Sequence, residues 1–246
     1  MKIFAHLRSE WFHYGFETLA VIVGILVAFA LDNWNESRKE EALEIRYLNG
    51  LKADLASDTA YYKRRIADSE GVIRDNSYHI QKMYQDQRSL EEARDLLSMV
   101  NWNSEQLTTQ NSTYIDLTNS GSLNLIGNQA LKEQVINYYR ETASAAAHII
   151  EFNEVSSRTL LDVNKVIRNY NKLIYVFDEL YGDTKVFYEG EWAFINEPTS
   201  EKFQTLENAL EIYSIKHKEF LGHFRTLKEL STRLIQEIEN ELETRK

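Results

Sequence analysis

The residues best placed to do chemistry follow one face of an apolar segment near the N-terminus. They step by three or four along the chain and so share one side of a continuous helix; they are Glu17, Ala20, Gly24, Ala28 and Asp32. Small residues at intervals of four let two membrane helices approach closely. A carboxylate inside the hydrocarbon edge is costly unless it is paired, protonated or hydrated. This face therefore predicts helix association within a membrane.

The two carboxylates of this association face admit two interpretations. In the first, Glu17 and Asp32 lie in the headgroup layer and mark the ends of the span, since each falls near the expected hydrocarbon edge. In the second, Glu17 faces a neighbouring helix in an oligomer and pairs there with His13 or with the partner's Trp11. The second interpretation leads to an alternative function in which Glu17 lines an ion or proton path through a homo-oligomer.

The same helical face continues upstream through histidines. His6, Glu10 and His13 have a spacing that suits zinc, but surface helices often carry such runs, so we expect no metal there. His148 shares a helix face with Glu151 and Glu154, in the reverse of the order used by di-iron sites.

The remaining histidines and the composition give no catalytic signature. His217 and His223 are six residues apart and are expected to face different sides of one helix. The absence of cysteine excludes disulfides, cysteine zinc sites and thiol catalysis. No phosphate-binding loop and no nucleophile elbow occurs. We expect no enzyme, no cofactor and no metal site, and the net charge of −10 argues against nucleic acid as a partner.

The element that must position the association face is a transmembrane helix. Residues 16–34 would span about 28 Å at ~1.5 Å per residue, close to the thickness of the hydrocarbon core. Aromatic residues gather at both ends, as membrane interfaces favour; the interfacial aromatics are Trp11, Tyr14 and Trp34. Residues 1–15 read as an amphipathic juxtamembrane segment.

A cleaved signal peptide is the competing interpretation of this segment. Ala28-Phe29-Ala30 has the small-x-small form that precedes a cleavage site. Against cleavage, the leading region is long and carries Glu10 and Glu17, and a helical pattern continues through Asn33-Trp34-Asn35-Glu36. We therefore expect a retained anchor.

Two blocks of sequence resemble a known bacterial family. Residues 17–38 read ETLAVIVGILVAFALDNWNESR, in which Glu17, Val23-Gly24-Ile25 and Asn33-Trp34-Asn35-Glu36 match the membrane segment of domain-of-unknown-function family six-zero-nine-zero. The sequence departs from that family in Phe16 and Asp32. The second block, residues 113–126 with Leu131 and Tyr138-Tyr139, is similar to the family's central block.

The resemblance implies a location but no activity. It implies a single-pass protein of the bacterial inner membrane with a cytoplasmic basic N-terminus and a periplasmic soluble domain. The local basic residues alone, Lys2 and Arg8 before the span and Arg38 and Lys39 after it, leave the orientation nearly balanced.

Residues 35–246 are expected to form a soluble, all-α domain. One proline and nine glycines over 246 residues favour long helices. An apolar stripe predicts that the membrane helix continues to about Gly71 or beyond; the stripe is Leu48, Leu51, Leu55, Tyr62 and Ile66. Ser89 and Glu92 form a predicted capping box, opening a helix through Met99, and residues 101–119 read as a loop with a short helix.

The second half of this domain is predicted to hold four more helices. Asn128 is the expected N-cap of a helix through about Arg140, and residues 143–177 form another. Residues 181–198 include β-leaning runs and predict a small hairpin. Closing helices are expected near 200–216 and 218–244, the last with a coiled-coil-like stripe.

These patterns together predict a membrane-anchored helical interaction module: a scaffold, sensor or assembly factor. Its expected partners are membrane lipid and either a second copy or another membrane protein.

Overall fold

The computed structural model describes residues 3–85, 89, 91–93, 96, 102, 104–167 and 192–245, and for residues 3–14 the backbone alone. Three long helices form its body: α1 (Ile3–Met83), α4 (Gln129–Val166) and α7 (Glu201–Glu243). The shorter elements are α3 (Ser112–Asn119) and the 3₁₀ helices η1 (Ser122–Leu125) and η2 (Ala193–Asn196). Over the described part of the chain there is no strand, which confirms the all-α prediction.

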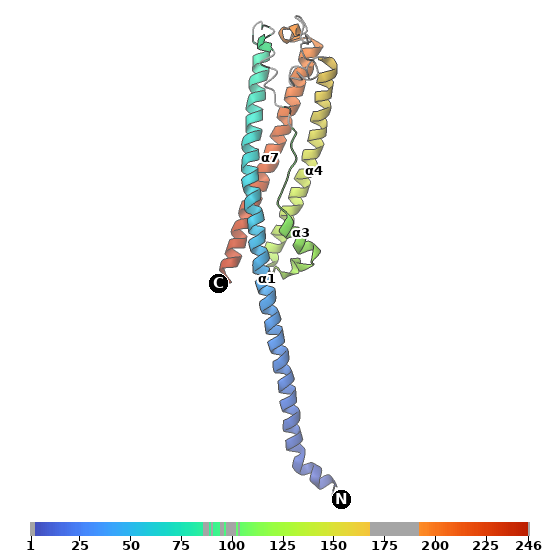
Figure 1. Ribbon diagram of the computed structural model, residues 1–246, viewed down its shortest axis with the longest axis vertical. Coiled ribbons are helices and arrows are strands. Elements are labelled where there is room, and N and C mark those ends of the chain that lie inside the picture. Colours follow the sequence, from blue (N-terminus) through green and yellow to red (C-terminus); the bar gives the residue numbers. More distant parts are fainter. Residues whose placement is uncertain are drawn as a thin grey trace, which may run out of the picture.

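Helix α1 is unbroken from its apolar segment into the bundle (Figure 1). No proline interrupts it, and Gly15 does not end it. Residues 15–42 are exposed throughout, and at Leu43 the helix begins to pack against the rest of the chain. These 28 exposed residues are about 42 Å long at ~1.5 Å per residue. The helix therefore projects from the bundle by more than the hydrocarbon thickness of a bilayer.

Helix α7 is the central member of the bundle, packing along both α1 and α4 (Figure 1). Residues 104–111, which we call the strap, run extended between α1 and α4. The Tyr61 hydroxyl of α1 donates to the Gln106 carbonyl at 3.0 Å, and the Asn153 amide of α4 donates to the Glu105 carbonyl at 2.8 Å. The strap thereby connects the two helices.

The bundle has two separate apolar cores. The proximal core, nearer the exposed end of α1, contains Leu48, Leu51, Leu55, Tyr62, Val135, Tyr138, Ile149, Phe220, Phe224 and Leu234 among others. The distal core contains Met83, Trp102, Val163, Trp192, Phe194, Phe203, Leu206, Leu210 and Tyr213 among others. The predicted stripe on α1 is confirmed, because four of its members are fully buried and Ile66 packs against the proximal core.

Two predicted helix boundaries are wrong. Residues 129–140 and 143–166 lie in the single helix α4, which ends at Val166, and residues 201–243 form the single helix α7. Residues 168–177, the rest of the predicted second helix, lie outside the described part. Thr142, at the first predicted boundary, lies inside α4. Its hydroxyl donates to the Tyr138 carbonyl of the preceding turn at 2.9 Å. The N-cap prediction is confirmed, because the Asn128 side chain accepts from the Leu131 N–H at 3.1 Å.

The predicted hairpin is wrong wherever the structure describes it. Residues 193–196, which include part of a β-leaning run, form η2; Val186-Phe187-Tyr188 lie outside the described residues. The capping box is confirmed: the Glu92 N–H donates to the Ser89 hydroxyl at 3.2 Å, and the Ser89 N–H donates to the Glu92 carboxylate at 2.9 Å.

Candidate functional site

The predicted association face lies on the exposed part of α1. Its five members, Glu17, Ala20, Gly24, Ala28 and Asp32, are all exposed on one continuous helix. A Cβ atom added at Gly24 would meet no atom within 4 Å, so no described residue covers the face there. The most apolar window of this helix is wholly unburied and is long and apolar enough to cross a membrane. Apolar surface of this extent requires a lipid or protein environment.

Among the interfacial aromatics, Trp34 is 60% exposed and stacks with a cation. The Arg38 guanidinium lies 5.1 Å from the centre of the Trp34 ring, one turn further along the helix. This places an amphipathic ring and a positive charge together at one end of the apolar segment, as in many membrane–water interfaces. The side chains of Trp11 and Tyr14, and those of His6, Glu10 and His13, lie outside the described residues.

A buried polar layer separates the two cores. Every helix of the bundle contributes to it: Ser69 from α1, Ser156 from α4, and Lys216 and His217 from α7 are buried where an apolar stripe would predict aliphatic residues. The Ser69 hydroxyl and the His217 Nδ1 have no hydrogen-bond partner among the residues that the structure describes. Buried polar groups in this state are costly, and proteins retain them for specificity or function.

Burial is the main influence on the pKa values of Lys216 and His217 in this layer. It lowers the pKa of Lys216 to about 8 and that of His217 to about 4, the second helped by the neighbouring positive charges of Lys216 and Arg65. The Lys216 ammonium lies 4.1 Å from the centre of the Tyr213 ring, a distance at which the negative ring face attracts a cation. At neutral pH, His217 is therefore uncharged.

The strap contributes a carboxylate next to this layer. Glu105 pairs with Arg65 of α1, while its backbone carbonyl accepts from Asn153 of α4. Further along the strap, the Asp58 carboxylate accepts from the Gln110 N–H and from the Tyr138 hydroxyl, both at 2.7 Å. Glu105 is thus held to α1 by an ion pair and to α4 by a neutral hydrogen bond, and Gln110 is held to α1 by a charge-assisted hydrogen bond.

An ionic clasp lies at the end of the bundle where α1 emerges. The guanidinium of Arg245 pairs with Glu44 of α1 and with Glu241 of α7, and the Glu44 carboxylate also accepts from the Gly127 N–H at 2.9 Å. Glu44 is only 6% exposed, and these partners offset the cost of burying its carboxylate. The clasp ties the base of α1 to the C-terminal end of α7.

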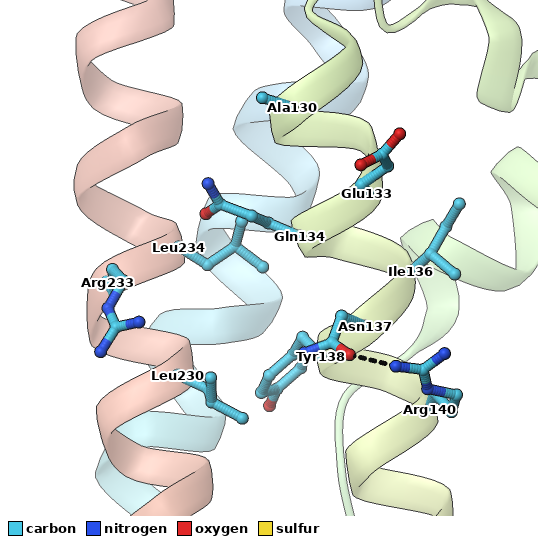
Figure 2. A pocket seen from close by; sticks show the side chains of 10 residues that line it. All are labelled: Ala130, Glu133, Gln134, Ile136, Asn137, Tyr138, Arg140, Leu230, Arg233 and Leu234. Carbon is cyan, nitrogen blue, oxygen red and sulfur yellow. Dashed lines mark hydrogen bonds between the residues drawn. The ribbon is translucent and has the colours of Figure 1, made fainter.

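An open groove of about 700 Å³ lies between α4 and α7 (Figure 2). Its walls carry Gln134 and Tyr138 from α4 and Leu230, Arg233 and Leu234 from α7. Arg140, on the rim, donates to Asn137 at 2.5 Å, the one hydrogen bond drawn in Figure 2. Tyr138 turns its hydroxyl away to Asp58 and Tyr62 in the proximal core. The lining therefore suits packing more than acid–base chemistry.

The histidines show one pairing that sequence reasoning missed. His148 and His223, from α4 and α7, have ring centres only 5.4 Å apart. Spacing along the chain carries no signal for it, because the two helices meet only through their antiparallel packing. Among the described residues, no group of three or more His, Asp and Glu side chains is arranged to hold a metal.

Comparison with known proteins gives one match. The model of a family of unknown function, DUF6090, matches residues 17–189. No curated protein and no solved structure matches the chain.

Proposed function

The chain belongs to DUF6090, a family of unknown function, and from this premise we propose that it is a membrane-anchored helical interaction module. In this role α1 crosses the bilayer once and holds the bundle close to the membrane surface. The bundle then meets a second copy of the chain or another membrane protein, as a scaffold, sensor or assembly factor. We assign the module no catalytic step.

The observation that carries this proposal is the continuity of α1. Helix α1 is exposed over residues 15–42, continues without a break, and contributes side chains to the core of the bundle from Leu48 onward. If residues 16–34 fill the hydrocarbon core, only residues 35–42 separate it from the bundle, about 12 Å of helix at ~1.5 Å per residue. A shift or rotation of the span is then passed directly to the bundle, because no flexible linker intervenes.

The proposed setting is the bacterial inner membrane, with the bundle in the periplasm. The sequence resemblance supports it, while the basic residues on the two sides of the span are nearly balanced and favour neither orientation. Protease added to spheroplasts provides the test: the bundle should be digested from outside while an epitope at the N-terminus survives. The reverse pattern would place the bundle in the cytoplasm.

Association through the span is the most direct test of an interaction role. Gly24→Ile adds bulk to the association face without making the span less apolar, so insertion should persist while cross-linked species decrease. Ala30→Ile is the matched control, since Ala30 lies about 120° around the helix from Gly24 at 3.6 residues per turn.

Cross-linking of wild type and both variants in native membranes gives distinct outcomes. Loss of cross-linked species with Gly24→Ile alone supports association through this face. Cross-linked species in equal amounts for all three proteins would assign association to the bundle. The absence of cross-linked species in all three would contradict the proposed function. A ring of many subunits would favour the alternative in which Glu17 lines an ion path.

A further inference from the structure

His148 and His223 approach each other across the α4–α7 contact. Their ring centres are 5.4 Å apart with the ring planes tilted by 53°, so the rings are not stacked in parallel. His148 is exposed and His223 is half-buried. Neither imidazole has a hydrogen bond or ion pair with another described residue. The pair therefore lies at the surface of the α4–α7 contact, where a dissolved ion can reach it.

The separation of the rings matches shared coordination of one metal ion. Zinc binds imidazole nitrogen at ~2.0–2.1 Å, which puts each ring centre about 3.2 Å from the metal. Two such rings at a tetrahedral angle have centres about 5.2 Å apart. The observed separation of 5.4 Å is close to this value.

A neutral imidazole supplies the lone pair that a metal requires, and an acidic residue lies close to the pair. Glu219 lies one turn before His223, and the charge of its carboxylate already acts on that ring.

We propose that His148 and His223 form a two-histidine site for a borderline divalent cation, Zn²⁺, that links α4 to α7. Imidazole is a ligand suited to Zn²⁺, Cu²⁺ and Ni²⁺ and little suited to Mg²⁺ or Ca²⁺. Water completes the coordination, with Glu219 available as a third ligand after rotation of its side chain. Because the ligands come from two helices, bound metal stabilises the packed bundle over the unfolded chain.

Zinc titration of the full-length protein in detergent, purified without a histidine tag, tests the proposal. The absence of cysteine removes thiolate binding as a competing signal. His148→Gln and His223→Gln should each weaken Zn²⁺ binding at least tenfold. The matched control is the double variant His6→Gln/His13→Gln, which removes the other pair of closely spaced histidines and should bind as wild type does.

Two further readouts separate a shared site from binding at single histidines. The melting temperature of wild type should rise with added Zn²⁺ and not with Mg²⁺, and neither single variant should show the rise. Cu²⁺ bound to wild type should show two nitrogen ligands by electron paramagnetic resonance, and one in each variant. Unchanged Zn²⁺ affinity in both single variants, or loss of binding in the His6/His13 control alone, overturns the proposal.

Discussion

Removal of the Asp58 carboxylate tests how the strap is held. This side chain is 1% exposed and accepts from the Gln110 N–H of the strap and from the Tyr138 hydroxyl of α4. Asp58→Ala leaves both donors buried without an acceptor. Hydrogen bonds to a charged group contribute about 1.5–3 kcal/mol each, which gives a gross loss of about 3–6 kcal/mol.

The cost of burying the Asp58 carboxylate reduces the expected loss of stability. Burial is the largest influence on Asp58 and raises its pKa despite the two donors, so the variant also removes an unfavourable buried charge. We expect a net loss of about 2–3 kcal/mol in the free energy of unfolding. Tyr138→Phe should cost about 1–3 kcal/mol, because it also loses the 3.0 Å contact with the Tyr62 hydroxyl.

The assay is chemical unfolding of the full-length protein in detergent, followed by circular dichroism, for wild type, both single variants and the double variant. We expect a coupling energy of about 1–2 kcal/mol between Asp58 and Tyr138. Hydrogen exchange should show loss of protection at Gln110. Tyr61→Phe is the matched control, since that hydroxyl bonds the strap at an exposed position and should cost about 0.5 kcal/mol. An Asp58→Ala variant as stable as wild type, or strictly additive effects, would refute this account of the strap.

Four further predictions address the clasp, the polar layer, the anchor and the bundle. Arg245→Ala should lower the free energy of unfolding by about 2–3 kcal/mol, because Glu44 stays buried without its guanidinium; Arg245→Lys should recover part of the loss in the same unfolding assay. Burial lowers the pKa of Lys216 from 10.5 to about 8, so between about pH 8 and pH 10.5 the unfolded chain binds a proton at this group that the folded chain does not, and stability rises with pH over that window. Lys216→Met should abolish that rise in pH-dependent unfolding, and an identical pH profile would contradict the assignment. Intact mass of the membrane-extracted protein should show no cleavage after Ala30. Residues 35–246 made alone should be soluble and strongly helical by circular dichroism, whereas a coil spectrum would show that the bundle needs its anchor.

The long helices could be predicted wherever the apolar stripe is continuous. On α1 the stripe from Leu48 to Ile66 and the absence of proline predict a helix that passes from the apolar segment into the bundle, and the structure confirms this continuity. The N-cap at Asn128 and the capping box at Ser89 were also predictable. These signals are local hydrogen bonds of known spacing.

The errors arise where polar residues enter the core. Lys216 and His217 interrupt the apolar stripe of α7, and this interruption resembles a helix boundary although the backbone continues. The polar layer depends on a strap residue, Glu105, and on side chains from three helices, so no periodicity in one segment reveals it. The pairing of His148 with His223 could not be predicted for the same reason, because it joins two different helices. Contacts between distant segments require the packing of the fold.

The measurement that tests the central claim most directly is the native mass of the protein extracted from its own membrane at natural expression level. An interaction module anchored by α1 should leave the membrane only with detergent, in a complex of fixed stoichiometry that contains a second copy or another membrane protein. Release by carbonate without detergent, or a native mass equal to that of one chain alone, would contradict the account.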